Sequence, residues 1–300
     1  MKESGFEFRE DVPKYGTDVT IRNIWQRHTQ KASAEIFVAD KDKISTSSIS
    51  SGGASRAEEK GRMIDASTHG AKGYRSESPR TLETFDALMA GYQDTNPNVP
   101  IREAVRVKKE LMAAEGNKEW MLLYDKKWSE KKTKLLQEGI ASDKYPNVPF
   151  NELSPDQQEE IAEAAEEPVI REWLDDSDSE LVELYPPKKQ AKIFAKLFDR
   201  RHERMAGKLN NNSEIDLFHN THKTTTEPFL ASGVLIRTSD KKRITKISEL
   251  GGSLQILDDW ESLVKTDSEG KPKTIIKIRG EEYRIDQDAY NELLSADEEV

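Results

Sequence analysis

The chain has 300 residues, no cysteine and a formal net charge of −10 at pH 7. The lack of cysteine excludes disulfides, thiolate metal sites and a cysteine nucleophile, and the acidic balance argues against a general nucleic-acid binder. Charged residues make up 34% of the chain and hydrophobic residues 35%, which favours long solvated helices around a modest core.

Membrane and export signals are not evident. No apolar run approaches the roughly 20 residues of a transmembrane helix, and the N-terminal segment from Met1 to Glu7 lacks the apolar core of a signal peptide. We therefore expect a cytoplasmic protein without membrane association. The sequence does not indicate an oligomeric state.

The first third of the chain alternates predicted strands and helices. β-forming residues recur from Val19 to Trp25 and predict a strand that ends at Gln26-Arg27-His28. A helix is predicted from Ala54 to Ile64 and a short strand from Ala71 to Arg75. A second helix is expected to begin at Pro79, with Ser78 as its N-cap, because proline suits the first helical position.

The middle of the chain is highly charged, and its pattern is helical from Ile101 to about Gln190. Ser154-Pro155-Asp156-Gln157 forms a capping box and predicts a helix start. A basic helix is predicted over residues 188–208. We interpret residues 105–212 as a helical insertion, or cap, between two parts of one core, residues 1–104 and 213–300.

The last third returns to strands. Ile215 to His219 predicts a strand that leads to His222, and a helix is predicted from Thr224 to Leu235. Further strand-like runs are Leu254–Leu257, Thr274–Ile278 and Tyr283–Ile285, and the segment after Asp286 is expected to end in a short helix. The turn at Arg279-Gly280 predicts a C-terminal β-hairpin.

Strands that alternate with helices indicate an α/β protein with a mostly parallel central sheet. Functional groups in such sheets gather beyond the carboxyl ends of the strands. His28, Ser76 and His222 follow predicted strand ends, so we expect them at one edge of the sheet.

These residues suit phosphoryl transfer through a histidine. A phosphomonoester carries about two negative charges near neutral pH, and the planar fork of arginine binds two phosphate oxygens at once. Arg27 and Arg80 are the candidate phosphate ligands, and the helix start at Ser78-Pro79-Arg80 adds backbone N–H donors. A neutral imidazole can attack phosphorus when a carbonyl fixes its tautomer, while a carboxylic acid protonates the leaving oxygen.

The N-terminal motifs resemble the histidine phosphatase superfamily, also called phosphoglycerate-mutase-like. Arg27-His28 is similar to its first signature, which implies that His28 is the phosphorylated nucleophile. Ile49 to Gly53, followed by Arg56-Ala57, resembles the next stretch. Ser76, Arg80, Thr81 and Thr84 match the third signature, which implies that Arg80 binds phosphate.

The later motifs continue this resemblance. Ile101-Arg102-Glu103 is similar to an element that supplies the acid/base, which implies that role for Glu103, and His222 resembles the last signature and would contact the phosphoryl group. Gly251 to Leu254 and the terminal hairpin resemble the end of the family's fold. The resemblance implies a three-layer α/β sandwich and a reaction that needs neither metal nor cofactor.

The chain departs from the family pattern at three places. Thr29 stands where glycine usually follows Arg-His, and Lys223 follows His222. The arginine expected a few residues after His28 is replaced only loosely by Lys31.

Several residues compete for the proposed roles. Glu110 and Glu227 are alternatives to Glu103, and His219 competes with His222, since alternation along a strand lets only one of them face the site. His69 and His202 are interpreted as surface residues. His219 and His222 have the spacing of two zinc ligands, but no third ligand is evident.

The sequence therefore predicts phosphomonoester hydrolysis in two steps, acting on a small phosphorylated substrate beneath the cap. A mutase-type phosphotransfer is one alternative. A catalytically weak relative that binds phosphorylated ligands or a protein partner is a second, and an acidic structural adaptor is a third.

Overall fold

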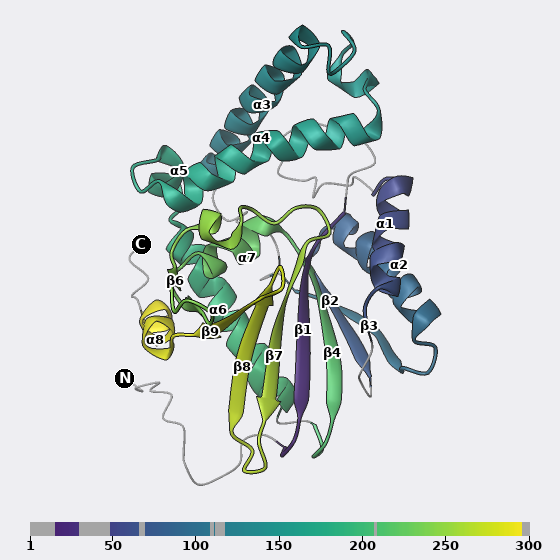
Figure 1. The fold of residues 1–300 in the computed structure, drawn as a ribbon, viewed down its shortest axis with the longest axis vertical. Helices are drawn as coiled ribbons and strands as arrows, with labels where there is room; N and C mark the ends of the chain where they lie inside the picture. The colour runs from purple at the N-terminus through teal and green to yellow at the C-terminus, as the bar shows by residue number, and fades with distance from the viewer. Residues whose placement is uncertain are drawn as a thin grey trace.

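The computed structural model describes residues 16–29, 49–65, 70–108, 111, 118–206 and 209–295, and it gives no side chains for residues 102–106 and 200–206. Its centre is a mixed sheet of nine strands in the order β3-β2-β4-β1-β7-β8-β9-β5-β6 (Figure 1). The strands are β1 (Thr20–Arg27), β2 (Ala71–Arg75), β3 (Ile101–Val107), β4 (Glu214–Thr221), β5 (Leu235–Arg237), β6 (Arg243–Ile244), β7 (Asp259–Thr266), β8 (Pro272–Ile278) and β9 (Glu281–Ile285).

The sheet has a parallel half and an antiparallel half. β3, β2, β4 and β1 are parallel, whereas β7, β8, β9, β5 and β6 continue the sheet with antiparallel pairs. The α/β class is confirmed, and the predicted hairpin is present as β8 and β9, which turn at Arg279-Gly280. The antiparallel half is larger than the sequence suggested.

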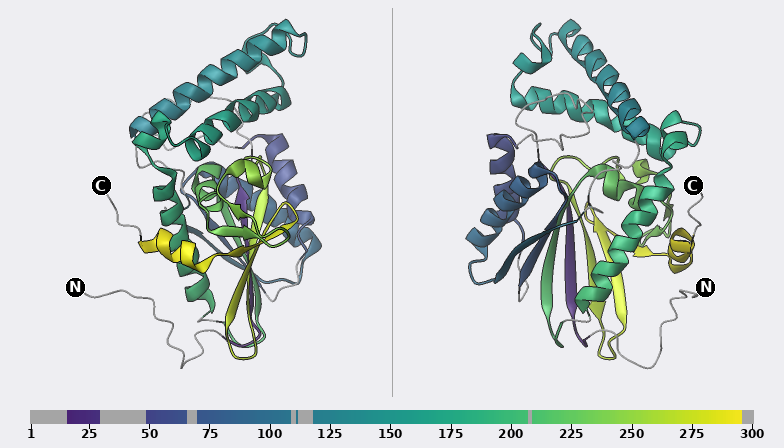
Figure 2. Two further views of the ribbon diagram at one scale, coloured as in Figure 1. Left: turned by 60° about the vertical axis from the view of Figure 1, so that its left-hand side comes forward. Right: turned by 180° about the vertical axis from the view of Figure 1, so that it is seen from behind.

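Helices cover both faces of this sheet (Figure 2). α1 (Ser51–Arg62) and α2 (Pro79–Thr95) lie against one face, where Phe85 and Leu88 pack on Ile24 and Phe218. α6 (Pro187–Ala206) lies against the other face. The remaining core helices are α7 (Lys223–Leu230) and α8 (Gln287–Ser295).

A row of stacked rings crosses four adjacent strands beneath α6. His219 pairs in register with Trp25 on one side and Tyr74 on the other, and its ring centroid lies 3.8 Å and 5.1 Å from theirs. Trp25 in turn stacks on Trp260 of β7 at 5.3 Å. Because a slip by one residue would turn each ring to the opposite face, the row fixes the register of β2, β4, β1 and β7.

The cap stands above one end of the sheet (Figure 1). It consists of α3 (Lys118–Ala141), α4 (Pro155–Asp175) and α5 (Glu180–Leu184), with a 3-10 turn at Phe150–Glu152. Trp120, Trp173 and Tyr185 form a small aromatic core of its own. The capping box predicted at Ser154 is present: the Ser154 hydroxyl accepts from the Gln157 N–H, and the Gln157 amide oxygen accepts from the Ser154 N–H.

Three expectations about these segments need correction. Residues 101–107 form strand β3 instead of the start of a helix, because their backbone pairs with β2 at the sheet edge. Leu254–Leu257 is irregular, and the strand comes after it as β7, in which every second residue from Trp260 to Thr266 is buried. Part of the predicted insertion 105–212 belongs to the core, because Phe194 and Phe198 of α6 pack on Trp25 in the sandwich.

The contact between α1 and α2 predicts a strong effect at Gly91. A Cβ at Gly91 would overlap the carbonyl oxygen of Glu58, a backbone atom of α1, whereas a Cβ at Gly52 would meet nothing within 4 Å. We expect Gly91→Ala to destabilise the fold by about 1–3 kcal/mol because the helices must separate. Urea unfolding followed by circular dichroism measures this. Gly52→Ala is the control, and an equally small effect of both changes would contradict the close crossing.

Candidate active site

The loops after three parallel strands meet where the sequence predicted. The His28 N–H donates to the Thr221 carbonyl at 3.1 Å, and the Ser76 N–H donates to the Asn220 carbonyl at 3.2 Å. These bonds extend the strand register by one residue beyond β1 and β2. They bring the rings of His28 and His222 to a centroid separation of 4.8 Å, with the rings edge-on to each other.

The surroundings of His28 fix its tautomer. Its Nδ1 lies 2.8 Å from the carbonyl oxygen of Thr29. Since a carbonyl oxygen can only accept, Nδ1 carries the proton and Nε2 keeps its lone pair. An imidazole in this form has one basic nitrogen available as a nucleophile.

The charge state of His28 is set by its burial and its neighbours. Burial lowers the pKa of His28 well below its ordinary value of 6.5, and the charges of Arg80 and Arg27 and the ring of His222 lower it further. The ring is therefore neutral at pH 7, as a nucleophile must be. The same effect indicates that positive charge gathers around His28.

His222 is oriented by the loop after β2. Its Nε2 lies 3.1 Å from the Ser76 hydroxyl, which also lies 3.0 Å from the Thr81 hydroxyl and accepts from the Ser78 N–H at 3.2 Å. His222 is also the N-cap residue of α7. The structure thus brings His28, Ser76 and His222 together.

The competing histidine lies in the core. His219 is fully buried in the aromatic row, and its Nε2 lies 3.0 Å from the Asn23 side-chain oxygen. Alternation along β4 therefore separates the two histidines as expected, with His222 at the end of the strand. His69 and the side chain of His202 lie outside the described residues.

The N-terminus of α2 brings Arg80 to the site. Arg80 is buried in the first turn of this helix, and its charge acts on His28. Ser78 is the N-cap residue predicted from the sequence, although its side chain makes no capping hydrogen bond. The cationic side chain of Arg80 and the N-terminus of α2 both favour the binding of an anion at this place.

The side chain of Thr29, which directly follows His28, is bonded to the helices beside the loop. Its N–H donates to the Thr84 hydroxyl at 3.1 Å, and its own hydroxyl donates to the Gly53 carbonyl at 3.2 Å. The side chain thus ties the loop to α1 and α2. Lys31 lies outside the described residues.

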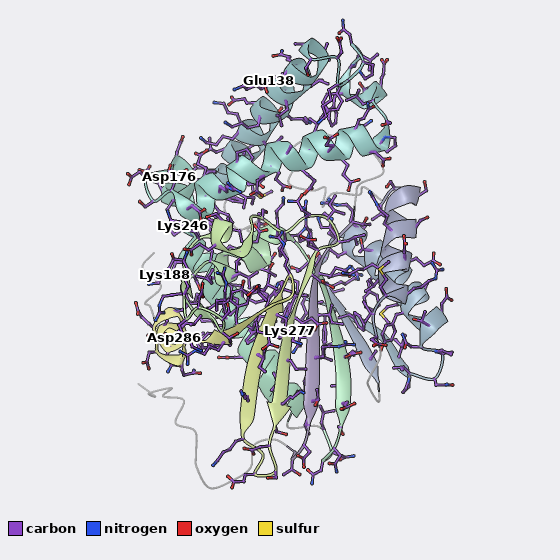
Figure 3. The ribbon with its side chains drawn as sticks, viewed as in Figure 1. Glu138, Asp176, Lys188, Lys246, Lys277 and Asp286 are labelled. Atoms are coloured by element: carbon purple, nitrogen blue, oxygen red, sulfur yellow. The ribbon has the colours of Figure 1, made fainter. Side chains whose placement is uncertain are left out.

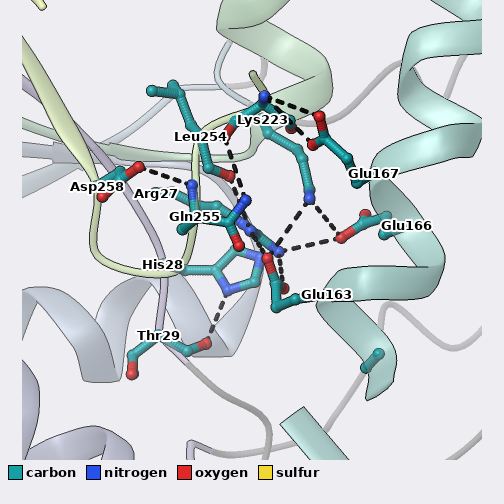
Figure 4. A network of polar contacts seen from close by, with 12 residues as sticks. Arg27, His28, Thr29, Glu163, Glu166, Glu167, Lys223, Leu254, Gln255 and Asp258 are labelled. Carbon is teal, nitrogen blue, oxygen red and sulfur yellow. Dashed lines mark hydrogen bonds and ion pairs between the residues drawn. The ribbon is translucent and has the colours of Figure 1, made fainter. Parts of the chain in front are cut away.

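Arg27 is engaged by the cap, which the sequence did not reveal. Both of its terminal nitrogens donate to Glu163 of α4, at 2.5 and 2.6 Å, and one also donates to Glu166 at 3.1 Å (Figure 4). Lys223 joins this network, with its ammonium 2.8 Å from Glu166 and 3.6 Å from Glu163. Arg27 and Glu163 are 136 residues apart in the sequence, so no local pattern predicts their contact. The only sequence signal for it was that Glu163 and Glu166 are spaced to lie on one face of a predicted helix.

The pKa values of two carboxyls near Arg27 are shifted in opposite directions. Burial disfavours the charged form of Glu166, but Lys223 and Arg27 outweigh it and lower its pKa to about 2. For Glu227 burial prevails over the attraction of Lys223 and raises the pKa to about 7. The Oε1 of Glu227 accepts from the Ser253 hydroxyl and the Leu254 N–H, while its buried Oε2 has no hydrogen-bond partner among the described residues.

The structure places the backbone of Glu103 in β3. The register pairs Lys72 with Arg102, Tyr74 with Arg106 and Arg75 with Val107, and it shifts between the first two of these pairs. The acid/base role of Glu103 stays a prediction. The side chain of Glu103 and the whole of Glu110 lie outside the described residues.

Metal-ligating clusters and membrane spans are both absent from the described part of the chain. It contains no group of three or more histidine, aspartate or glutamate side chains placed to hold a metal ion. None of its helices is long and apolar enough to cross a membrane.

No family model and no curated protein matches the chain. Several solved structures match it at low sequence identity. Phosphoglycerate mutase from Bacillus anthracis has 13% identity and a TM-score of 0.41, over 92% of this chain and 97% of that one. The phytase from D. castellii has 15% identity and a TM-score of 0.46, over 99% and 83%. A mycobacterial glucosyl-3-phosphoglycerate phosphatase has 12% identity and a TM-score of 0.41, over 88% and 96%.

The position of His28 predicts an unusual titration. We expect its ring to stay neutral, with the proton on Nδ1, at pH values where a free imidazole is already protonated, because burial and the nearby arginines lower its pKa. Long-range ¹H–¹⁵N NMR spectra recorded between pH 5 and 8 report the tautomer and charge. The same protein unfolded in urea is the control and titrates near 6.5. A folded-state midpoint at or above 6.5 would contradict the assignment.

The ion pairs of Glu166 predict a pH-dependent contribution to stability. Because its folded pKa is about 2, against 4.5 when unperturbed, the contribution is present above pH 4.5 and is lost as the pH falls toward 2. We expect Glu166→Gln to destabilise the protein by on the order of 1–3 kcal/mol at pH 7, and less at pH 3.5. Urea unfolding at both pH values measures this.

The matched control for this change is Glu138→Gln. Glu138 lies on α3 at the outer side of the cap (Figure 3), where it is 59% exposed and 3.7 Å from Lys134. An exposed pair of this kind contributes little, so its removal should leave the unfolding midpoint unchanged. The free energy of unfolding should differ less between wild type and Glu166→Gln at pH 3.5 than at pH 7. An equal difference at both pH values would argue against the buried ion pair.

Proposed function

We propose that the chain is a phosphomonoester hydrolase that works through a phosphohistidine at His28. The observation that carries this proposal is the 2.8 Å contact between His28 Nδ1 and the Thr29 carbonyl, which leaves Nε2 unprotonated. Around it lie the cations and helix N-terminus that a phosphoryl group requires. The reaction class rests on these groups together.

The first half-reaction transfers the phosphoryl group to the protein. Arg80, Arg27 and His222 hold the non-bridging oxygens, with the N–H groups at the start of α2. Lys223, which directly follows His222, adds a further cation for them. His28 Nε2 attacks phosphorus, the bond from phosphorus to the ester oxygen breaks, and the alcohol leaves with a proton from an acid. In the second half-reaction water attacks phosphorus, and the phosphorus–nitrogen bond breaks to regenerate His28.

We propose Glu227 as the acid in place of Glu103. Its pKa of about 7 lets it hold a proton near neutrality and take one back from water in the second step. Its buried Oε2, which has no partner among the described residues, is the oxygen on which this proton would sit. Lys223 and Arg27 interact electrostatically with it, which supports its proximity to the phosphate ligands.

The alternatives differ in the fate of the phosphoryl group. A mutase would return it from His28 to a second hydroxyl instead of water, and the same residues would serve. A relative that only binds phosphorylated ligands would keep the arginines but not the transfer. Binding alone would not require a neutral imidazole with a fixed tautomer, whereas a nucleophile does. The state of His28 therefore favours phosphoryl transfer over binding alone.

The first test is hydrolysis of an aryl phosphate in the presence of EDTA. We expect turnover by the wild type and its loss, by at least about 10³-fold, in His28→Ala, because no other group replaces the nucleophile. Arg62→Gln, an exposed change on α1, is the control and should retain full activity. Equal turnover by wild type and His28→Ala would exclude His28 as the nucleophile.

The leaving group tests the role of Glu227. An alkoxide needs protonation far more than a nitrophenolate does, so Glu227→Gln should slow hydrolysis of an alkyl phosphate at least tenfold more than that of 4-nitrophenyl phosphate. The ratio of the two kcat/KM values measures this. An equal loss on both substrates would assign Glu227 a structural role.

A further inference from the structure

The two cations beside the proposed nucleophile are already neutralised within the chain. Arg27 is 6% exposed and is bound by both oxygens of Glu163, and Lys223 is 3% exposed and lies 2.8 Å from Glu166. A carboxylate and a phosphate present similar pairs of oxygens to a guanidinium. A phosphoryl group that binds Arg27 must therefore displace a carboxylate from it.

The displaced carboxylates stay near the site because α4 is fastened to the core independently of Arg27. Glu159, one turn before Glu163, forms an ion pair with Arg56 of α1 at 2.6 Å. Glu167 accepts from the Ser253 N–H at 3.2 Å, and Asp175 at the end of the helix accepts from the Ile247 N–H. The side chains of Glu163 and Glu166 can shift, but the helix that carries them remains in place.

Charge balance then favours a particular substrate. With the phosphoryl group on Arg27 and Lys223, Glu163 and Glu166 lose their counter-charges while only 15% and 19% exposed. A carboxylate in such surroundings is destabilised unless another cation pairs with it.

We infer that Glu163 and Glu166 select a phosphomonoester whose alcohol part carries a cationic nitrogen close to the ester oxygen. This inference rests on the proposed function and names its substrate class. The phosphoryl group replaces the two carboxylates on Arg27 and Lys223, and the substrate's own cation replaces Arg27 and Lys223 on the carboxylates. A substrate whose alcohol part carries a carboxylate is disfavoured by the same charges.

The test compares two phosphonates that differ in one group. 2-Aminoethylphosphonate carries an ammonium where 2-hydroxyethylphosphonate carries a hydroxyl, and neither has an ester bond that His28 can cleave. Calorimetric titration of the wild-type protein at pH 8, where both phosphonate groups are dianions, gives the two dissociation constants. We expect the amino compound to bind at least tenfold more tightly.

Matched variants assign this preference to α4. Glu163→Gln and Glu166→Gln should each reduce the preference to threefold or less, because glutamine keeps the size of the side chain but neither its charge nor the second accepting oxygen. Glu159→Gln, on the same helix but paired with Arg56 at the rim, should retain it. Unchanged preference in Glu163→Gln and Glu166→Gln, despite native circular dichroism, would overturn the assignment.

The outcomes separate this inference from the proposed function. Equal binding of both phosphonates, or tighter binding of the hydroxyl compound, overturns the selectivity, and the wild-type measurement alone decides this even if a variant fails to fold. Absence of binding by either compound also overturns it. Hydrolysis of the aryl phosphate by the wild type but not by His28→Ala would leave the proposed function standing in each of these cases.

Discussion

The register of four strands is the constraint on which the site depends. Tyr74, His219, Trp25 and Trp260 lie side by side across β2, β4, β1 and β7, and their stacking excludes a slip of any one strand. His28 and His222 each lie three residues beyond their ring in this row, and Ser76 lies two residues beyond Tyr74. A histidine buried in the core, His219, therefore helps to place the other two, His28 and His222, beside each other.

Several positive charges lie close together in the site, and carboxylates of the cap compensate them. Arg27, Arg80 and Lys223 are all buried; Arg27 and Arg80 both act on His28, and Arg27 and Lys223 both act on Glu227. Buried charges of one sign would cost the fold several kcal/mol if they were unpaired. Glu163 and Glu166 of α4 supply the opposite charge to Arg27 and Lys223. The same ion pairs that stabilise the folded chain oppose phosphate, so stability and ligand binding compete for one pair of cations.

Local patterns predicted the parts of the site that depend on strand ends and helix starts. Arg27-His28, the helix at Pro79 and the position of His222 are evident in short runs of sequence, and β1, β2, β4 and α2 formed as their patterns indicated. The helical pattern predicted from Ile101 was wrong because residues 101–107 pair with β2 and form strand β3. Glu163 was missed because its contact with Arg27 is set by the packing of α4 on the core, which no local pattern encodes.

Lys223 and the cap are linked by charge. Lys223 directly follows His222 and is buried in the folded chain. Its ion-pair partners, Glu166 and Glu163, both come from α4, and Glu163 also binds Arg27. A buried cation is destabilised unless a counter-charge lies close to it. The helix α4 is therefore more than a cover above the end of the sheet, because its two carboxylates compensate the charges of Arg27 and Lys223.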